Sequence, residues 1–301
     1  MDVDKQNGNV GFNEKEHVYF NLDDENVRYI SVTTLIGKYI PPYDSEFWSA
    51  YKALERLIPK DSWKTESKAL RDTRKIDKSL FAIYDIDENE FNKVQQDILD
   101  EWEKINRESC ERGTKIHAML ENTFYKAGKN VSLQKFGIGG KFECRKDYTD
   151  LNLEYGVYPE YLLFRESKDG LLRIAGQADL IIKSGNDIII VDHKTSKKIE
   201  QKGFYDNKIK SNEKLLYPLN HLDACNFYEY SLQLSTYAWM LQKINPDFVI
   251  KDLILNHYDH EGNNVLYHCP YLKKEVEAML KDYKKKMIKE KQRERYKPIE
   301  Y

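Results

Sequence analysis

The stretch LLRIAGQADLIIKSGNDIIIVDHKTS, residues 171–196, decides the fold of this chain. Two apolar runs rich in β-branched residues flank a short polar segment that contains Gly185 and Asn186. Gly-Asn is a favoured two-residue turn between antiparallel strands, so we predict a β-hairpin here. Counting outward from this turn, the two strands pair Asp179 directly with Asp192.

This register brings two carboxylates together on one face of the sheet. Directly opposed side chains have Cβ atoms roughly 4.5–5.5 Å apart, and like charges at that separation are destabilising. Lys194 shares the face of Asp192, whereas His193 points to the other face. Both strands are apolar on both faces, which indicates burial on both sides, where a carboxylate without a partner is costly. The pattern therefore predicts a divalent metal between Asp179 and Asp192.

Two alternatives to this metal site stay open at the level of sequence. An ordinary edge hairpin would turn the same polar residues toward water. A slip of one residue in the pairing would also place Asp179 on the opposite face of the sheet.

The composition is that of a globular protein with a solvated surface. Of the 301 residues, 41% are hydrophobic and 33% are charged, and the net charge is −2. A segment long and apolar enough to span a membrane is not evident, and neither is a targeting segment, so we expect a cytoplasmic protein with no membrane partner. Four scattered cysteines without a CxxC spacing argue against an iron–sulfur cluster.

The remaining pattern predicts an α/β protein with helices at its N-terminal end. Ser31, Thr33 and Thr34 can cap a short helix that ends before Pro41-Pro42. The expected strands are 16–21, 27–32, 158–166, 171–183, 187–194, 249–259 and 264–268. The expected helices are about 44–59, 65–80, 87–126, 226–243 and 272–295, with a loop over 127–156.

Several motifs in order resemble the PD-(D/E)XK nuclease superfamily, and more narrowly its RecB and lambda-exonuclease branch. The pieces are GTKIHAMLE (113–121), PEYLLF (159–164), GQADLII (176–182), IIIVDHKTS (188–196) and QLSTY (233–237). This branch includes many phage recombination exonucleases and the mitochondrial genome-maintenance exonuclease. The resemblance implies a restriction-endonuclease-like core, a mixed central sheet flanked by helices. We expect this core over 87–301, with an insertion at about 196–225 and a basic C-terminal helix, after strands and a helical elaboration in 1–86.

The resemblance also implies the site. Asp179, Asp192, His117 and the backbone carbonyl of His193 would bind Mg²⁺, with Mn²⁺ as a possible substitute. Lys194 would orient the attacking water or stabilise the charge on the phosphate, and Gln233 and Tyr237 would face the active site. Simple core packing of Tyr237 remains an alternative. Glu160 and Glu121 are candidates for a second metal or for supporting contacts, although each is equally well an ordinary surface carboxylate.

The implied activity is metal-dependent exonuclease action on linear single- or double-stranded DNA, in recombination, replication or end processing. A recombination or replication protein is a possible partner. We expect DNA contacts from Arg112, Lys115, Arg71 and Arg74. The alternatives are a structure-selective or flap endonuclease on the same fold, and a non-catalytic DNA-binding subunit with a nuclease-like domain.

Overall fold

A computed structural model of the chain describes residues 1–146, 153–206, 210–259 and 263–295. Contacts group these residues into two compact units. The sheet unit comprises 1–40, 115–204 and 213–301, and the helical unit comprises 41–114 and 205–212. This division differs from the boundary expected at residue 86, because the N-terminal strands join the large sheet and the long helix α5 (Glu88–Ala127) contributes residues to both units.

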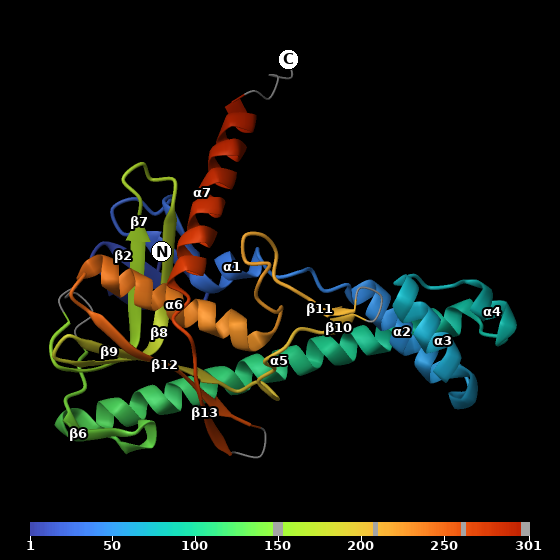
Figure 1. Cartoon of the computed structure of the whole chain (residues 1–301), viewed down its shortest axis with the longest axis horizontal. Coiled ribbons are helices and arrows are strands. Elements are labelled where there is room, and N and C mark those ends of the chain that lie inside the picture. Colours follow the sequence, from blue (N-terminus) through green and yellow to red (C-terminus); the bar gives the residue numbers. More distant parts are fainter. Residues whose placement is uncertain (147–152, 207–209, 260–262, 296–301) are drawn as a thin grey trace. The chain divides into compact units, whose positions relative to one another are not determined.

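The sheet unit is built on a nine-stranded mixed sheet (Figure 1). Along its main path the strands run in the order β1-β2-β3-β4-β8-β9-β12-β13, and β7 pairs with β8. The pairs β4–β8 and β9–β12 are parallel, and the others are antiparallel. The strands are β1 (Lys5–Asn7), β2 (Val10–Asn13), β3 (Val18–Asn21), β4 (Arg28–Ser31), β7 (Gly156–Glu166), β8 (Arg173–Ser184), β9 (Asp187–Lys194), β12 (Val249–Tyr258) and β13 (Asn264–His268).

Helices cover one face of this sheet. Apolar residues of α1 (Val32–Gly37), α6 (Asn226–Ile244) and α7 (Lys273–Arg295) form one core cluster with residues of β7, β8, β9 and β12. The helix α6 lies in the connection from β9 to the parallel strand β12, and parallel pairing requires such a crossover.

The opposite face of the central strands packs under the C-terminal part of α5 (Glu88–Ala127). Phe124 of that helix joins Leu180, Val191 and Ile254 in a second core cluster. Short elements complete the layer: the two-stranded sheet of β5 (Val131–Leu133) and β6 (Ile138–Phe142), with the 3-10 turns η1 (Gly128–Asn130) and η2 (Gln134–Phe136). The central strands are therefore buried on both sides, as their continuous apolar runs predicted.

The helical unit has its own core. Phe47, Leu54, Leu70, Phe91 and Ile98 are among its buried residues. Its elements are α2 (Ser45–Leu57), α3 (Lys60–Thr73), α4 (Ser79–Ile83), the first part of α5, and the two-residue strands β10 (Tyr205–Asp206) and β11 (Ser211–Asn212).

The predicted hairpin register is confirmed. Ser184 pairs with Asp187 around the Gly185-Asn186 turn, and Gly185 adopts the positive φ of 61° that this turn needs. The short helix α1 is confirmed as well, with the Ser31 hydroxyl accepting from Thr34 N at 3.0 Å.

Other sequence expectations were wrong in detail. One helix over 65–80 is in fact two, because Arg74 has a left-handed backbone (φ 54°) and ends α3. The expected loop 127–156 contains β5 and β6, and the strands β1 and β2 were missed because each is only three or four residues long. The insertion at 196–225 includes β10 and β11, and its residues 207–209 lie outside the described residues.

Candidate metal centre

Three carboxylates lie in one row across neighbouring strands of the sheet. The β8–β9 register sets Asp179 across from Asp192, one step beyond the pair Leu180–Val191. On the other edge of β8, the β7–β8 register sets Glu160 across from the same Asp179. Asp179 and Asp192 are buried, so this row concentrates negative charge inside the protein.

Glu160 stands in an unusual backbone conformation for a strand residue. Its φ is 49°, in the left-handed region, which costs a non-glycine residue on the order of 1–3 kcal/mol. Such strain is retained where surrounding structure enforces it, often at functional sites. Here it accompanies a side chain whose Oε1 lies 3.5 Å from His117 Nδ1.

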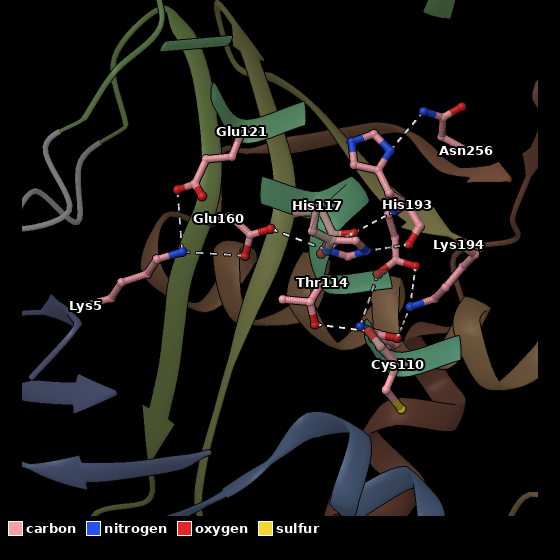
Figure 2. A network of polar contacts seen from close by, with 12 residues as sticks. Lys5, Cys110, Thr114, His117, Glu121, Glu160, His193, Lys194 and Asn256 are labelled. Atoms are coloured by element: carbon pink, nitrogen blue, oxygen red, sulfur yellow. Dashed lines mark hydrogen bonds and ion pairs between the residues drawn. The ribbon is translucent and has the colours of Figure 1, made fainter. Parts of the chain in front are cut away.

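His117 of α5 completes the row. Its Nδ1 lies 3.6 Å from Asp179 Oδ2, and its Nε2 lies 3.0 Å from the carbonyl oxygen of His193 (Figure 2). Burial alone would lower the pKa of His117, but Asp179, Glu160 and Asp192 outweigh it and raise that pKa to about 9. The protonated ring therefore acts as a counter-charge to the carboxylates whenever no other cation is bound.

The two central carboxyl groups are buried at a cost, and one of them is held by a short hydrogen bond. Asp179 Oδ2 accepts from the backbone N–H of His193 at 2.6 Å. Burial raises the pKa of Asp179, and it raises the pKa of Asp192 to about 6, with the charge of Asp179 adding to the effect. A cation bound between these groups would remove that penalty.

Lys194 lies at the Asp192 end of the row. Its Nζ is 2.7 Å from Asp192 Oδ2 and 3.3 Å from Gln233 Oε1. Burial would lower the pKa of Lys194, but Asp192 and Asp179 raise it, so the ammonium stays charged. Gln233 Nε2 in turn donates to Asp192 Oδ1 and to the hydroxyl of Tyr237, each at 3.2 Å.

Gln233 and Tyr237 thus reach the carboxylate row from α6, and their part in an active site stays a prediction. Tyr237 is buried and also belongs to the core cluster, so it both contacts Gln233 of the site and packs in the core. A third residue of the same helix was missed. The ring of Tyr230, one turn before Gln233, has its centre 4.5 Å from Lys194 Nζ, and the spacing of residues 230, 233 and 237 on one helix face was the available signal.

His193 directs only its backbone toward the row. Burial lowers the pKa of its side chain to about 3, so the ring is neutral. Its Nδ1 accepts from Asn256 Nδ2 at 2.9 Å, a contact from β12 that the sequence did not reveal. The carbonyl oxygen lies 3.0 Å from His117 Nε2, and its role as a main-chain metal ligand stays a prediction.

Glu121 lies one turn beyond His117 but turns away from the carboxylate row. Its Oε1 accepts from Tyr125 at 3.0 Å and lies 3.6 Å from Lys5 Nζ. Lys5 also lies 3.7 Å from Glu160 Oε2, so it links the two carboxylates (Figure 2).

Of the expected DNA contacts, Lys115 is exposed on the part of α5 that belongs to the sheet unit. Arg71, Arg74 and Arg112 belong to the helical unit. The guanidinium of Arg74 stacks on Trp48 at 4.8 Å from the ring centre. DNA binding by all four residues stays a prediction.

A small cavity adjoins the carboxylate row. It has a volume of about 180 Å³ and is lined by Glu160, Asp179, Gly176, Gln177 and Tyr237, among others. It lies along one edge of β8, between the part that pairs with β4 (residues 174–175) and the part that pairs with β9 (residues 180–184). Gln177 Nε2 is buried there and has no hydrogen-bond partner among the described residues.

The donor set suits a hard divalent cation. One ligand atom from each of His117, Glu160 and Asp179 can be chosen so that all lie within 4.8 Å of one another. Asp192 Oδ2 is buried and, within the described part of the chain, has only the ion pair with Lys194, so it has a lone pair to offer. Carboxylate and carbonyl oxygens with one imidazole are compatible with Mg²⁺ and with Mn²⁺.

No family model and no curated protein matches the sequence. Among solved structures, a protein from Eubacterium rectale named provisionally as an exonuclease is 10% identical, with 88% of this chain and 81% of that chain covered and a TM-score of 0.32. The protein SSO0001 is 20% identical over 42% of this chain and 48% of its own, with a TM-score of 0.26. These likenesses are too weak to define the fold or the activity.

The cysteines and the helices add two further observations. Cys225 and Cys269 are buried and Cys110 is exposed, and all four cysteines are free thiols. Within the described ranges, no helix combines the length and the apolar character needed to cross a membrane.

Proposed function

We propose that this protein is a metal-dependent nuclease of the PD-(D/E)XK superfamily with a restriction-endonuclease-like core. It hydrolyses phosphodiester bonds in DNA, as an exonuclease acting on linear ends in recombination, replication or end processing. The observation that carries the proposal is the row Glu160, Asp179 and Asp192, with His117 against Glu160 and Asp179 and the half-buried Lys194 against Asp192.

The residues of the row would hold the cation. His117, Asp179, Asp192 and the carbonyl of His193 are the proposed ligands, with Glu160 beside them. When bound, Mg²⁺ or Mn²⁺ supplies Lewis-acid polarisation of a phosphate oxygen and favours ionisation of the attacking water. As a ligand, His117 would be neutral, so the proton that it carries beside the carboxylates would be released.

Lys194 is the proposed catalytic cation of the chain itself. Its ammonium is held by Asp192 and Gln233, with the ring of Tyr230 beside it. A fixed positive charge in a partly dehydrated site stabilises the negative charge that develops on a phosphate in the transition state. Gln233 positions Lys194 and Asp192 together, and Tyr237 supports Gln233 from the core.

The experiment compares linear double-stranded DNA, linear single-stranded DNA and closed circles, each with Mg²⁺, with Mn²⁺ and with EDTA. Asp192→Ala and Lys194→Ala are the test variants. Asp187→Ala is the matched control, because Asp187 lies at the start of the same strand, is 47% exposed and lies 3.5 Å from Lys251 Nζ.

Each outcome has a distinct meaning. Metal-dependent loss of linear DNA with circles spared, abolished in both test variants and kept in the control, supports the proposal. Cutting of circles identifies an endonuclease on the same fold. DNA binding without degradation, unchanged in the variants, leaves a non-catalytic DNA-binding subunit and overturns the nuclease.

A further inference from the structure

Lys5 is held at the metal centre by the architecture of the sheet. It lies on β1, where it pairs with Phe12 of β2. Two residues later, the fully buried Asn7 donates to the carbonyl of Leu162 on β7 at 2.8 Å. Side chains two apart on a strand point the same way, so this anchor also directs Lys5 toward β7.

The ammonium of Lys5 lies between two carboxylates. Lys5 Nζ is 3.6 Å from Glu121 Oε1 and 3.7 Å from Glu160 Oε2 (Figure 2). All three side chains are largely withdrawn from solvent, with 21%, 22% and 15% of their surface exposed. Their mutual attraction is therefore less screened than that of a surface ion pair.

Glu160 faces two ways. Its Oε1 is directed to His117 in the row of proposed metal ligands, and its Oε2 is directed to Lys5. A carboxylate that presents one oxygen to each of two cations is what a site with two divalent ions, about 3.5–4 Å apart, would use. In this protein the cation beside Glu160 Oε2 is the Lys5 ammonium.

We propose that Lys5 occupies the position of a second divalent cation, so that the centre binds a single metal ion. This inference rests on the metal site of the proposed function. The ammonium neutralises Glu121 and Glu160, but it offers no Lewis acidity and no open coordination positions. The chemistry at the scissile phosphate would then depend on one ion together with Lys194.

Removing the charge of Lys5 should expose the second position. Lys5→Met keeps most of the apolar stem and leaves Glu121 and Glu160 facing each other without a cation. Like charges in a partly buried site repel, and a divalent ion relieves that repulsion. Lys5→Arg keeps the positive charge and serves as the conservative variant. Lys168→Met, at an exposed position in the turn before β8, is the control for loss of a lysine.

The test is Mn²⁺ binding to the full chain without DNA, with stoichiometry from titration calorimetry and ion–ion coupling from electron paramagnetic resonance. We expect one ion in the wild type, in Lys5→Arg and in Lys168→Met. We expect two ions with a coupled spectrum in Lys5→Met, and a return to one when Glu121→Gln is added. Lys5→Gln replaces Lys5→Met if the latter does not fold, with the same expected outcome.

The contrary results are separable. Two ions in the wild type would show that Lys5 does not hold the position. One ion in a folded Lys5→Met would show that Glu121 and Glu160 do not make a cation site. No binding by any protein would overturn the metal centre of the proposed function and this inference with it, whereas loss of DNA cleavage alone would leave the inference standing.

Discussion

At the scale of the residue, Lys194 combines partial burial, with 18% of its side chain exposed, with a retained charge. The charges of Asp192 and Asp179 offset the cost of burying the ammonium, so it stays protonated. The hydrogen bond to the Gln233 side-chain carbonyl also fixes its orientation. A lysine in such a setting loses little hydration and little conformational freedom on binding a phosphate, because the folded protein has already reduced both.

Replacing Lys194 by Met should abolish most DNA cleavage while leaving the metal bound. We expect the rate at saturating Mn²⁺ to fall roughly 100- to 1,000-fold, the effect of removing one preorganised group that stabilises transition-state charge. Single-turnover cleavage with Mn²⁺ affinity measured in parallel checks this. A fall in metal affinity that accounts for all of the lost rate would contradict the assigned role.

Gln233→Leu should have a smaller effect, about tenfold, because the change removes no charge and the loss of Lys194 positioning costs roughly 1 kcal/mol in total. The measurement is the same single-turnover rate. Equal losses in Gln233→Leu and Lys194→Met would instead make Gln233 an equal partner in the chemistry.

The cysteine thiols should differ strongly in reactivity. Burial raises the pKa of Cys269 to about 12 and that of Cys144 to about 11, so almost none of either is thiolate near neutral pH. Cys110 is exposed and should react first with a disulfide reagent. Counting fast-reacting thiols in the native wild type and in Cys110→Ser tests this, and rapid modification of Cys269 in the folded protein would contradict it.

At the scale of the element, β8 is central to the site because its two edges pair with different sets of strands. One edge pairs with β7 along most of its length, whereas the other is divided between β4 and β9. The undivided edge keeps Glu160 and Asp179 in register, and the divided edge leaves room for the cavity beside Asp179.

Gly176 on this strand lies directly against Tyr237, which makes it a sensitive point. A Cβ at Gly176 would lie 2.8 Å from Tyr237 Cε1, so Gly176→Ala should push the buried ring and lower the free energy of unfolding by about 1–3 kcal/mol. Urea unfolding measures this. Gly139→Ala is the control, since among the described residues, its chain neighbours aside, no atom lies within 4 Å of the place of its methyl group. Equal destabilisation of the two variants would refute the packing argument.

The sequence predicted this part of the fold well because the signals were local. The Gly185-Asn186 turn chemistry set the register, and that register brought Asp179 and Asp192 together. The role of Lys5 was not foreseen, since it depends on β1 docking against β7, far along the chain. The left-handed backbone of Glu160 was equally hidden, because tertiary packing rather than residue type enforces it.

At the scale of the whole molecule, a centre of buried carboxylates should make stability depend on metal. Ligand binding to the folded state alone stabilises by about 2.7 kcal/mol at a concentration 100 times Kd. We expect Mn²⁺ to raise Tm by several degrees in the wild type and much less in Asp179→Asn. A thermal melt with and without Mn²⁺ decides it, and an equal shift in Asp179→Asn would place the bound ion elsewhere.

The carboxylate row has a consequence for how the chain acquires its structure over time. Glu160, Asp179 and Asp192 all lie in the consecutive strands β7, β8 and β9, joined by short turns. Contacts between neighbouring segments close faster than distant ones, so this meander should form early. The three carboxylates then come together before Lys5, His117 and Gln233, which lie in distant segments of the chain, have docked. At that stage Lys194 is the one cation of the site that can offset their repulsion. Divalent ions present during refolding should therefore accelerate it, in addition to stabilising the finished protein.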